Sequence, residues 1–541
     1  MTLGIDRRTL LKAGALGLGA LAAPGAAQLL VARGFTHDVA SGEPGHYKVM
    51  LWTRYVPAAG DSARLSYQVS RTPDFAAILA SGETVAEAER DWCVKPVAEG
   101  LAPGGWYYYR FRDSAGRSSP VGRTRTLPNG AVERFALGVF SCANLPFGHF
   151  NAYAHAAARR DVDLMLHLGD YLYEYPRGTY PGAAAALPGR IIEPAGETVA
   201  LADYRMRYAA YRSDPDLQQL HRMFPMVMMW DDHESANDSW EGGAQNHQPE
   251  TEGDWQVRKA AAMRACREWL PVSEEPWRHY RIGDLATLFR PETRLTARSQ
   301  PLSLDRFLQG RTDIPRALAE FRDGPWRDPA RTMLGAEQEA WLARGLRHSA
   351  GDGVKWQLLG QQVLMGTVAV APEAAGWLRP ETDERVRRAV NAGLAAARAG
   401  LPFNLDMWDG YPAARERLLR AARDADANLI VLSGDSHNGW AFDLDLGGAA
   451  AGVDLGVQSV TSPGFESFLP WVDPAELARA TVAASPQLKW ADTSRRGYLT
   501  LALSPERATA EWLLLDTVRR RSTRLAGRHQ MSVAHGTNRL G

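Results

Sequence analysis

Two patterns of hydrophobic positions divide the chain near residue 128. Before it, short segments of alternating apolar and polar residues are separated by Gly and Pro, as at residues 48–56, 63–70, 91–101 and 105–113. Alternation with a period of two predicts strands with one buried face, and several short strands in series are typical of a β-sandwich. We therefore predict a small N-terminal β-sandwich domain of immunoglobulin or fibronectin type over residues 31–128.

After residue 128, longer hydrophobic runs alternate with amphipathic stretches such as residues 149–160. The runs occupy residues 134–140, 162–168, 224–230, 354–360, 427–434 and 453–460. Runs that are apolar on both faces are typical of strands in a partly parallel sheet covered by helices. Residues 497–515 predict a closing β-hairpin. We predict an α/β domain over residues 129–541, with functional loops at residues 178–197 and 237–253 because these are long and irregular.

The first thirty residues follow a different pattern. Arg7 and Arg8 precede a stretch of Ala, Gly and Leu that runs to about Leu30. Twin arginines before such a segment predict a Tat export signal over residues 1–30, with cleavage near Ala26 or Ala27. Its glycines and Pro24 argue against a membrane span, and a buried N-terminal helix is the alternative. The Tat machinery is then a partner, and the mature protein is periplasmic or extracellular.

Charge and cysteine content exclude several classes of protein. Lys+Arg and Asp+Glu both number 62, so no net charge favours nucleic acid as a partner. Three cysteines are too few for the disulfide framework of an exported protein of this size. The sequence around Cys93 and Cys266 predicts core positions. Cys142, which follows a predicted strand, is a candidate for chemistry.

Chemically active residues follow four predicted strands at the point where each ends. The four sequences are Ser141-Cys142, Gly169-Asp170 with Tyr173 beyond it, Asp231-Asp232-His233-Glu234, and Gly434-Asp435-Ser436-His437. An Asp after a strand is commonly a turn residue or helix cap, but four such ends favour one shared site, because the carboxyl ends of parallel strands meet at one rim. Carboxylates crowded together repel one another, and bound cations resolve that repulsion.

The residue types indicate which cations. A thiolate and a phenolate, from Cys142 and Tyr173, together with carboxylate suit Fe3+. Zinc usually recruits more histidine. The oxygen donors that suit Ca2+ are Asp170, Asp232, Asn237 and Asp435.

The histidines of these strand ends have two possible roles. His233 and His437 can each bind a metal or transfer a proton. We take both as candidate catalytic residues and His437 also as a candidate metal ligand.

The ordered motifs of the chain resemble those of the PhoD-type alkaline phosphatase/phosphodiesterase family, in the metallophosphatase superfamily. They are "DVASGEPGHYKVMLWTR", "SCANLPFGHFNAY", "HLGDYLYEY", "WDDHESANDSW", "WQLLGQQ", "WDGYPAARERLL", "VLSGDSHNGWAFDL", "SVTSPGF" and "RGYLTLAL". With the twin-arginine segment they cover nearly the whole chain. The resemblance implies an αββα sandwich of metallophosphatase type, preceded by a small β-sandwich.

The resemblance also implies roles for site residues. Cys142, Asp170 and Tyr173 match the positions that hold iron in the family, with Asp170 as the bridging carboxylate. The remaining matches are Asp435 and His437 as ligands near the C-terminal end of the sheet, Asp232 and His233 in place of an Asn-His pair, and Asn237 as a further calcium ligand.

Two positions depart from the family pattern. Residues 290–294 read Arg-Pro-Glu-Thr-Arg where relatives often have Leu-Asp-Thr-Arg, which leaves the role of Arg294 open. Gln458 stands where an acidic residue is expected. Both changes affect the expected edge of the site, so they bear on substrate preference more than on fold.

The function that these features predict is hydrolysis of a small phosphate ester, a monoester or a diester, by attack of a metal-activated water. His233 or His437 would then protonate the leaving oxygen. Ser462 in "TSPGF" lacks the setting of a nucleophile elbow and predicts a plain turn. One alternative is a phospholipase D-like phosphodiesterase, for which a membrane matters only as a source of lipid substrate. The other is a non-enzymatic calcium-binding protein, although calcium alone has no use for the Cys142 thiolate.

Overall fold

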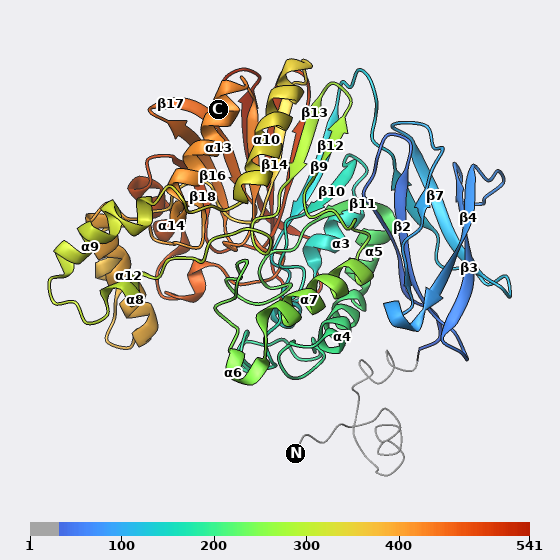
Figure 1. Ribbon diagram of the computed structural model, residues 1–541, viewed down its shortest axis with the longest axis horizontal. Coiled ribbons are helices and arrows are strands. Elements are labelled where there is room, and N and C mark those ends of the chain that lie inside the picture. Colours follow the sequence, from blue (N-terminus) through green and yellow to red (C-terminus); the bar gives the residue numbers. More distant parts are fainter. Residues whose placement is uncertain (1–31) are drawn as a thin grey trace, which may run out of the picture.

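Two β-sheets pack face to face at the centre of the molecule (Figure 1). The computed structural model describes residues 32–541. The first sheet has ten strands, in the order β21-β20-β19-β9-β10-β11-β1-β2-β5, with β6 paired to β2. These strands are β1 (Gly34–Gly42), β2 (Val49–Val56), β5 (Cys93–Val94), β6 (Val97–Ala98), β9 (Phe135–Phe140), β10 (Leu164–His167), β11 (Pro225–Met228), β19 (Gly497–Leu503), β20 (Arg507–Leu515) and β21 (Leu525–Ala534).

The second sheet has seven strands, in the order β12-β13-β14-β15-β17-β16-β18. Its central strands β13, β14, β15 and β17 run parallel to one another. In the first sheet, β9, β10, β11 and β1 are likewise parallel. The strands of the second sheet are β12 (Arg278–Ile282), β13 (Ala286–Arg290), β14 (Trp356–Gly360), β15 (Leu429–Ser433), β16 (Gly439–Leu446), β17 (Ala449–Gly456) and β18 (Leu488–Asp492).

Alternation along the central strands explains why their hydrophobic runs are continuous. In β10, Leu164 and Leu166 belong to the core between the sheets, whereas Met165 packs with the helices on the outer side. In β15, Ile430 faces the inter-sheet core and Val431 faces the helices of the second sheet. Because neighbouring side chains of a strand point to opposite faces, both faces of these strands must be apolar. The predicted αββα sandwich is confirmed.

Helices cover the outer face of each sheet (Figure 1). Over the first sheet lie α3 (Asn151–Ala157), α4 (Leu201–Arg212), α5 (Pro215–Met223) and α7 (Trp255–Trp269). Over the second sheet lie α10 (Gly335–Gly351) and α13 (Pro412–Asp424). The remaining helices are α6 (Pro249–Glu252), α8 (Leu304–Leu308), α9 (Ile314–Asp323), α11 (Ala374–Trp377), α12 (Glu384–Arg398) and α14 (Pro474–Ala484), with 3-10 turns at Ala88–Arg90, Leu145–Phe147, Pro325–Arg327, Trp408–Gly410 and Phe465–Ser467.

The N-terminal region is a β-sandwich that shares a layer with the larger domain. Its separate sheet has the order β4-β3-β7-β8, from β3 (Ser62–Ser70), β4 (Ala80–Glu87), β7 (Trp106–Asp113) and β8 (Gly122–Arg125). Side chains such as Val69 and Phe111 pack against Leu51 and Val39 of β2 and β1. Since Ser41 of β1 pairs in parallel with Pro225 of β11, the second layer of the sandwich continues the first large sheet.

The Tat signal predicted for residues 1–30 lies outside the described residues. Among residues 32–541, no helix combines the length and the apolar character needed to cross a bilayer.

Candidate metal centre

The candidate site lies where the carboxyl ends of β9, β10, β11 and β15 meet. The first three strands are neighbours in the first sheet, and β15 belongs to the second. The sequence pattern predicts one shared rim. That rim spans both sheets, because the turn at Gly434 after β15 lies against Ser141 after β9. Cys142, Asp170, Asp232 and Asp435 reach the site from these four strand ends.

Sharp turns after the strands aim these side chains at one another. Cys142, Asp170, Asp435 and His437 have φ angles of 60°, 53°, 60° and 65°. This left-handed region is uncommon for residues other than Gly and clusters at functional sites. The fold therefore accepts a backbone conformation of higher energy at these four residues, and that conformation directs their side chains into the site.

Two glycines allow the turns to approach closely. A Cβ at Gly169 would lie 2.4 Å from Cβ of Asp231, so only Gly lets the turn after β10 touch the turn after β11. A Cβ at Gly434 would lie 2.3 Å from Oγ of Ser141, where the turns of the two sheets meet. In the Gly-Asp motif at each of these strand ends, the glycine lets the turns come close together and the aspartate supplies the carboxylate.

The first group of candidate ligands joins both sheets. Cys142, Asp170 and His437 each offer a ligand atom within 4.8 Å of the others. Tyr173 Oη donates to Asp170 Oδ2 at 2.9 Å and lies 3.2 Å from His437 Nε2. Nδ1 of His437 donates to the carbonyl of Pro463 at 2.8 Å, which leaves its Nε2 lone pair facing the group.

The second group shares Asp170 with the first. Asp170, Asp232 and His233 again place ligand atoms within 4.8 Å of one another. Nδ1 of His233 lies 2.7 Å from Oε2 of the fully buried Glu174, so it donates to this carboxylate and Nε2 is left for the site. Asp170 belongs to both groups, which is the position that a bridging carboxylate would need.

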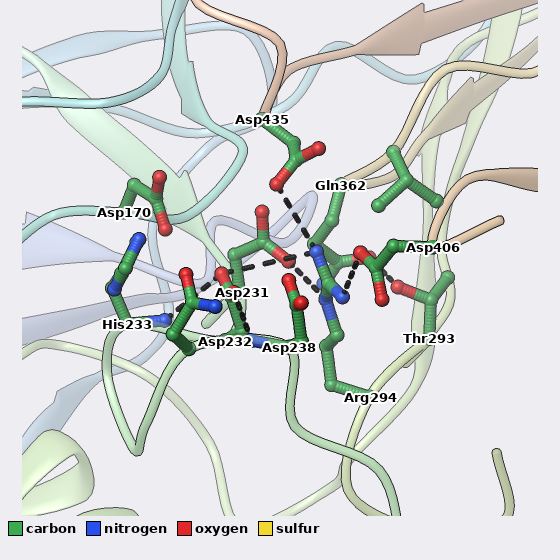
Figure 2. Close-up of polar contacts among 12 residues, drawn as sticks. Asp170, Asp231, Asp232, His233, Asp238, Thr293, Arg294, Gln362, Asp406 and Asp435 are labelled. Atoms are coloured by element: carbon green, nitrogen blue, oxygen red, sulfur yellow. Dashed lines mark hydrogen bonds and ion pairs between the residues drawn. The ribbon is translucent and has the colours of Figure 1, made fainter. Parts of the chain in front are cut away.

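A third group consists of Asp231, Asp232 and Asp435, and Arg294 lies against it (Figure 2). Arg294 has no exposed surface. Its guanidinium pairs with Asp231, with Asp435 at 3.2 Å and with Asp232 at 3.8 Å.

Asp406 completes the charge network around Arg294. It pairs with Nη1 of Arg294 at 2.6 Å and with Nη2 of the equally buried Arg298 at 2.6 Å. This arrangement gives Arg294 a role that its departure from the family pattern had left open: it offsets the charge of the acidic group and orients Asp435.

Burial makes the first group costly to ionise without cations. It raises the pKa of Cys142 and of Tyr173 well above their usual values, and the neighbouring Asp170 carboxylate raises both further. The pKa of Asp170 is itself raised well above normal, mainly by burial. A cation would favour the ionised forms of all three.

The donor atoms also fit a cation. Oδ1 of Asp170 and Oδ2 of Asp231 are buried and have no hydrogen-bond partner. Unpaired buried carboxylate oxygens are expensive unless they face a positive charge. The residues present therefore suit metal binding.

The two histidines have opposite electrostatic environments. Burial lowers the pKa of His437 to about 4, so its ring is neutral and able to ligate. Burial also opposes the charge of His233, but Asp232, Glu174 and Asp170 outweigh it and raise the pKa of His233 well above normal. His437 is suited to hold a metal and His233 to hold a proton.

Glu234 fixes two of the turns relative to each other. Its carboxylate accepts from the backbone N–H groups of Asp170 at 3.1 Å and of Asp231 at 2.7 Å. Burial raises the pKa of Glu234 to about 8. The side chain that ends the "DDHE" motif therefore stabilises the geometry of the site and does not point into it.

Of the other two residues named from the sequence, Asn237 lies at the site and Gln458 does not. Asn237 lines the cavity beside the carboxylates, and its Nδ2 donates to Gln245 at 3.0 Å, which leaves its amide oxygen for a cation. Gln458 does not join the site: it is buried and donates to the carbonyls of Tyr498 and Leu513 at 3.3 Å and 3.2 Å. An amide suits those acceptors, whereas a carboxylate would repel them.

Sequence reasoning assigned no role to several residues of the site. They are Glu174, Asp231, Asp238, Arg298 and Asp406. Glu174 and Asp231 belong to the motifs already singled out, so their proximity to the chosen ligands was a usable signal. Asp406 and Arg298 are distant in sequence from those strand ends and carry no local pattern.

Comparisons with known proteins identify the family of the chain and support its fold. Residues 137–512 match the family model of PhoD-like phosphatase, and residues 21–128 match that of the PhoD-like phosphatase N-terminal domain. The chain belongs to the PhoD-like phosphatase family. Alkaline phosphatase D of Bacillus subtilis (strain 168) is 32% identical over 434 residues, which are 76% of this chain and 66% of that protein. A solved structure of PhoD has a TM-score of 0.76 at 27% identity, over 96% of this chain and 93% of that one.

In this PhoD-like phosphatase, Glu174→Gln is expected to lower kcat/KM for a phosphate ester by about 10–100-fold, the usual cost of losing a carboxylate behind a functional histidine. The amide is similar in size but cannot hold His233 as an imidazolium. Steady-state kinetics across pH tests this, because the variant should also lower the pH at which activity is lost on the alkaline side. An unchanged pH profile would contradict the role assigned to Glu174.

Proposed function

We propose that this chain is an exported, metal-dependent phosphoesterase that hydrolyses phosphate monoesters, diesters or both. One observation carries the proposal: strand ends from two sheets bring thiol, phenol, imidazole and carboxylate groups together around shared, unsatisfied oxygens. Membership of the PhoD-like phosphatase family and similarity to an alkaline phosphatase D support a phosphate ester as the substrate.

The proposed cations are Fe3+ and Ca2+. Cys142, Tyr173 and Asp170 supply strongly donating anionic atoms that suit Fe3+, and His437 adds a neutral imidazole nitrogen. The oxygen donors for Ca2+ are Asp170, Asp232, Asn237 and Asp435. When bound, such cations lower the pKa of water and offset the negative charge of a phosphoryl group.

The chain's own residues supply orientation and protons. His233, held through Nδ1 by Glu174, presents a protonated Nε2 to the site and can pass that proton to the leaving oxygen. His437 is fixed by Pro463 and neutral, so we assign it to metal binding and no longer to proton transfer. Of the two catalytic candidates from the sequence, the geometry favours His233.

Export by the Tat route is part of the proposal. Arg7 and Arg8 before an apolar segment support it. The route carries folded proteins, which suits a protein that must assemble its metals from residues 142 to 437 before leaving the cell. A periplasmic or extracellular location follows.

Metal analysis combined with an activity assay tests the proposal. The purified protein is expected to contain iron and calcium and to hydrolyse nitrophenyl phosphate, bis-nitrophenyl phosphate or both. Cys142→Ala should lose iron and activity together, whereas Cys93→Ala, a buried cysteine outside the site, should keep both. A folded, iron-free protein that hydrolyses neither ester would contradict the proposal and favour a calcium-binding protein without enzymatic activity.

A further inference from the structure

A cavity of about 510 Å³ opens beside the candidate metal centre. This volume lies in the range of cavities that hold small organic ligands, about 300–1,000 Å³. Part of the lining is acidic and consists of Asp170, Asp232, Asp238, Asp406 and Asp435. Figure 2 shows these carboxylates around Arg294 and His233.

The rest of the lining is largely apolar and comes from segments far apart in the sequence. Val386, Ala389 and Val390 lie on one face of α12, at the spacing of three and four residues that places side chains side by side on a helix. Phe465 and Phe468 reach the cavity from the segment that follows β17, and Leu477 reaches it from α14.

The rest of the protein covers these apolar side chains only in part. Phe468 is 57% exposed and Phe403, which also lines the cavity, is 41% exposed. Val386 and Val390 are half-buried. Large apolar side chains around an open cavity are typical of a ligand-binding site, because the ligand covers the surface that the fold leaves in water.

The charges of the residues that line the cavity indicate which kind of ligand it can bind. The residues that line this cavity in the described part of the chain include no Lys or Arg, while five carboxylates stand in its acidic part. His233, to which we assign a proton, lies among the carboxylates of the metal centre, so an ester whose remote part is also anionic would meet no cationic side chain along the rest of the described lining and would be repelled. An uncharged, apolar group would instead bury itself against α12 and the phenylalanines.

We infer that this cavity binds phosphate esters in which an esterified alcohol carries an uncharged aliphatic chain. The phosphate lies at the metal centre and the chain lies along Val386, Val390 and Phe468. This inference rests on the proposed phosphoesterase function and names its substrate class.

Two nitrophenyl phosphodiesters, one with methanol and one with hexanol as the second alcohol, test the inference on the metal-loaded protein. Both are soluble as monomers and release the same nitrophenol. We expect kcat/KM for the hexyl ester to exceed that for the methyl ester by at least about tenfold, since each methylene buried on an apolar wall contributes to the preference. Equal values would overturn the inference.

Val390→Asp places a charge on the apolar wall and is expected to lower the hexyl-to-methyl ratio at least about fivefold. Val257→Asp is the matched control, since Val257 is 69% exposed on α7 and does not line the cavity. It should keep the wild-type ratio. An equal loss in both variants, or no loss in Val390→Asp, would contradict the role of this wall.

Calorimetric binding of hexylphosphonate and methylphosphonate separates this inference from the proposed function. Tighter binding of hexylphosphonate by a protein that hydrolyses neither ester would keep the cavity and reject the phosphoesterase. Hydrolysis of both esters without preference, with equal phosphonate binding, would reject the cavity and keep the phosphoesterase.

An assay on phosphatidylcholine vesicles tests whether the aliphatic chain of the substrate belongs to a membrane lipid or to a soluble ester. Cleavage of the soluble hexyl ester alone assigns the cavity to soluble amphiphiles. Cleavage of the vesicle lipid as well assigns it to lipids, and cleavage of the vesicle lipid without any preference among the soluble esters would overturn the inference.

Discussion

Asp170→Ala is expected to lower kcat/KM for phosphate esters by about 10³-fold or more and to release the bound metals. Asp170 belongs to two of the three candidate ligand groups, with Cys142 and His437 on one side and Asp232 and His233 on the other. Losing Asp170 removes the carboxylate that both groups share. Without the cations that it would hold, the charge of the transition state is not stabilised, and a 10³-fold loss of rate corresponds to about 4 kcal/mol of activation free energy. Metal content by mass spectrometry and steady-state kinetics on the same preparation measure both effects.

The matched control is Asp305→Ala, which removes an exposed carboxylate from α8. Metal content and activity should stay at the wild-type level in that variant. If Asp170→Ala retained both metals and full activity, the assignment of the centre to these strand ends would be wrong. Loss of activity with retention of both metals would show that Asp170 acts on the substrate and not as a bridge.

Arg294→Ala is expected to destabilise the protein by about 3–5 kcal/mol, the usual cost of removing one partner from a buried ion pair. The guanidinium is fully buried and pairs with Asp231, Asp406 and Asp435. Without it, the buried Asp231 and the partly buried Asp435 lose their cationic partner, Asp406 keeps only Arg298, and the pKa of Asp435, which burial already raises to about 7, should rise further. The midpoint of thermal unfolding of the metal-loaded protein measures the loss.

Two variants sharpen this test. Arg294→Lys keeps the charge but not the planar fork that meets several carboxylates at once, so its midpoint should lie between wild type and Arg294→Ala. Arg528→Ala breaks an exposed pair with Glu511 at 3.1 Å and should cost about 0–1 kcal/mol. An Arg294→Ala midpoint no lower than that of Arg528→Ala would show that the carboxylates do not depend on Arg294.

Much of this architecture was predictable because its cause is local. A strand buried on both faces must be apolar at every position, so the runs around Leu166 and Val431 identified central strands without further information. The residues placed directly after those strands could then be assigned to one rim, because strand ends fix where a side chain must emerge. Asp170 and Asp435 follow from this reasoning.

Other features depend on contacts between distant segments. The pairing of Ser41 with Pro225, which joins the N-terminal sandwich to the large sheet, leaves no mark in the pattern of either strand. Arg294 meets Asp406 across 112 positions of sequence, and no periodicity links them. The apolar wall of the cavity likewise combines α12 with Phe468, so only the folded chain reveals it.

Cys142, Asp170 and Tyr173 are expected to share one iron ion at the junction of the two sheets, and an anomalous-difference map at the iron absorption edge measures this directly. Crystals of the protein as isolated should give one iron peak within bonding range of Cys142 Sγ, the Asp170 carboxylate and Tyr173 Oη, and this peak should be lost when data are collected below the edge. Absence of that peak, or an iron peak elsewhere in the molecule, would show that these three residues do not hold iron.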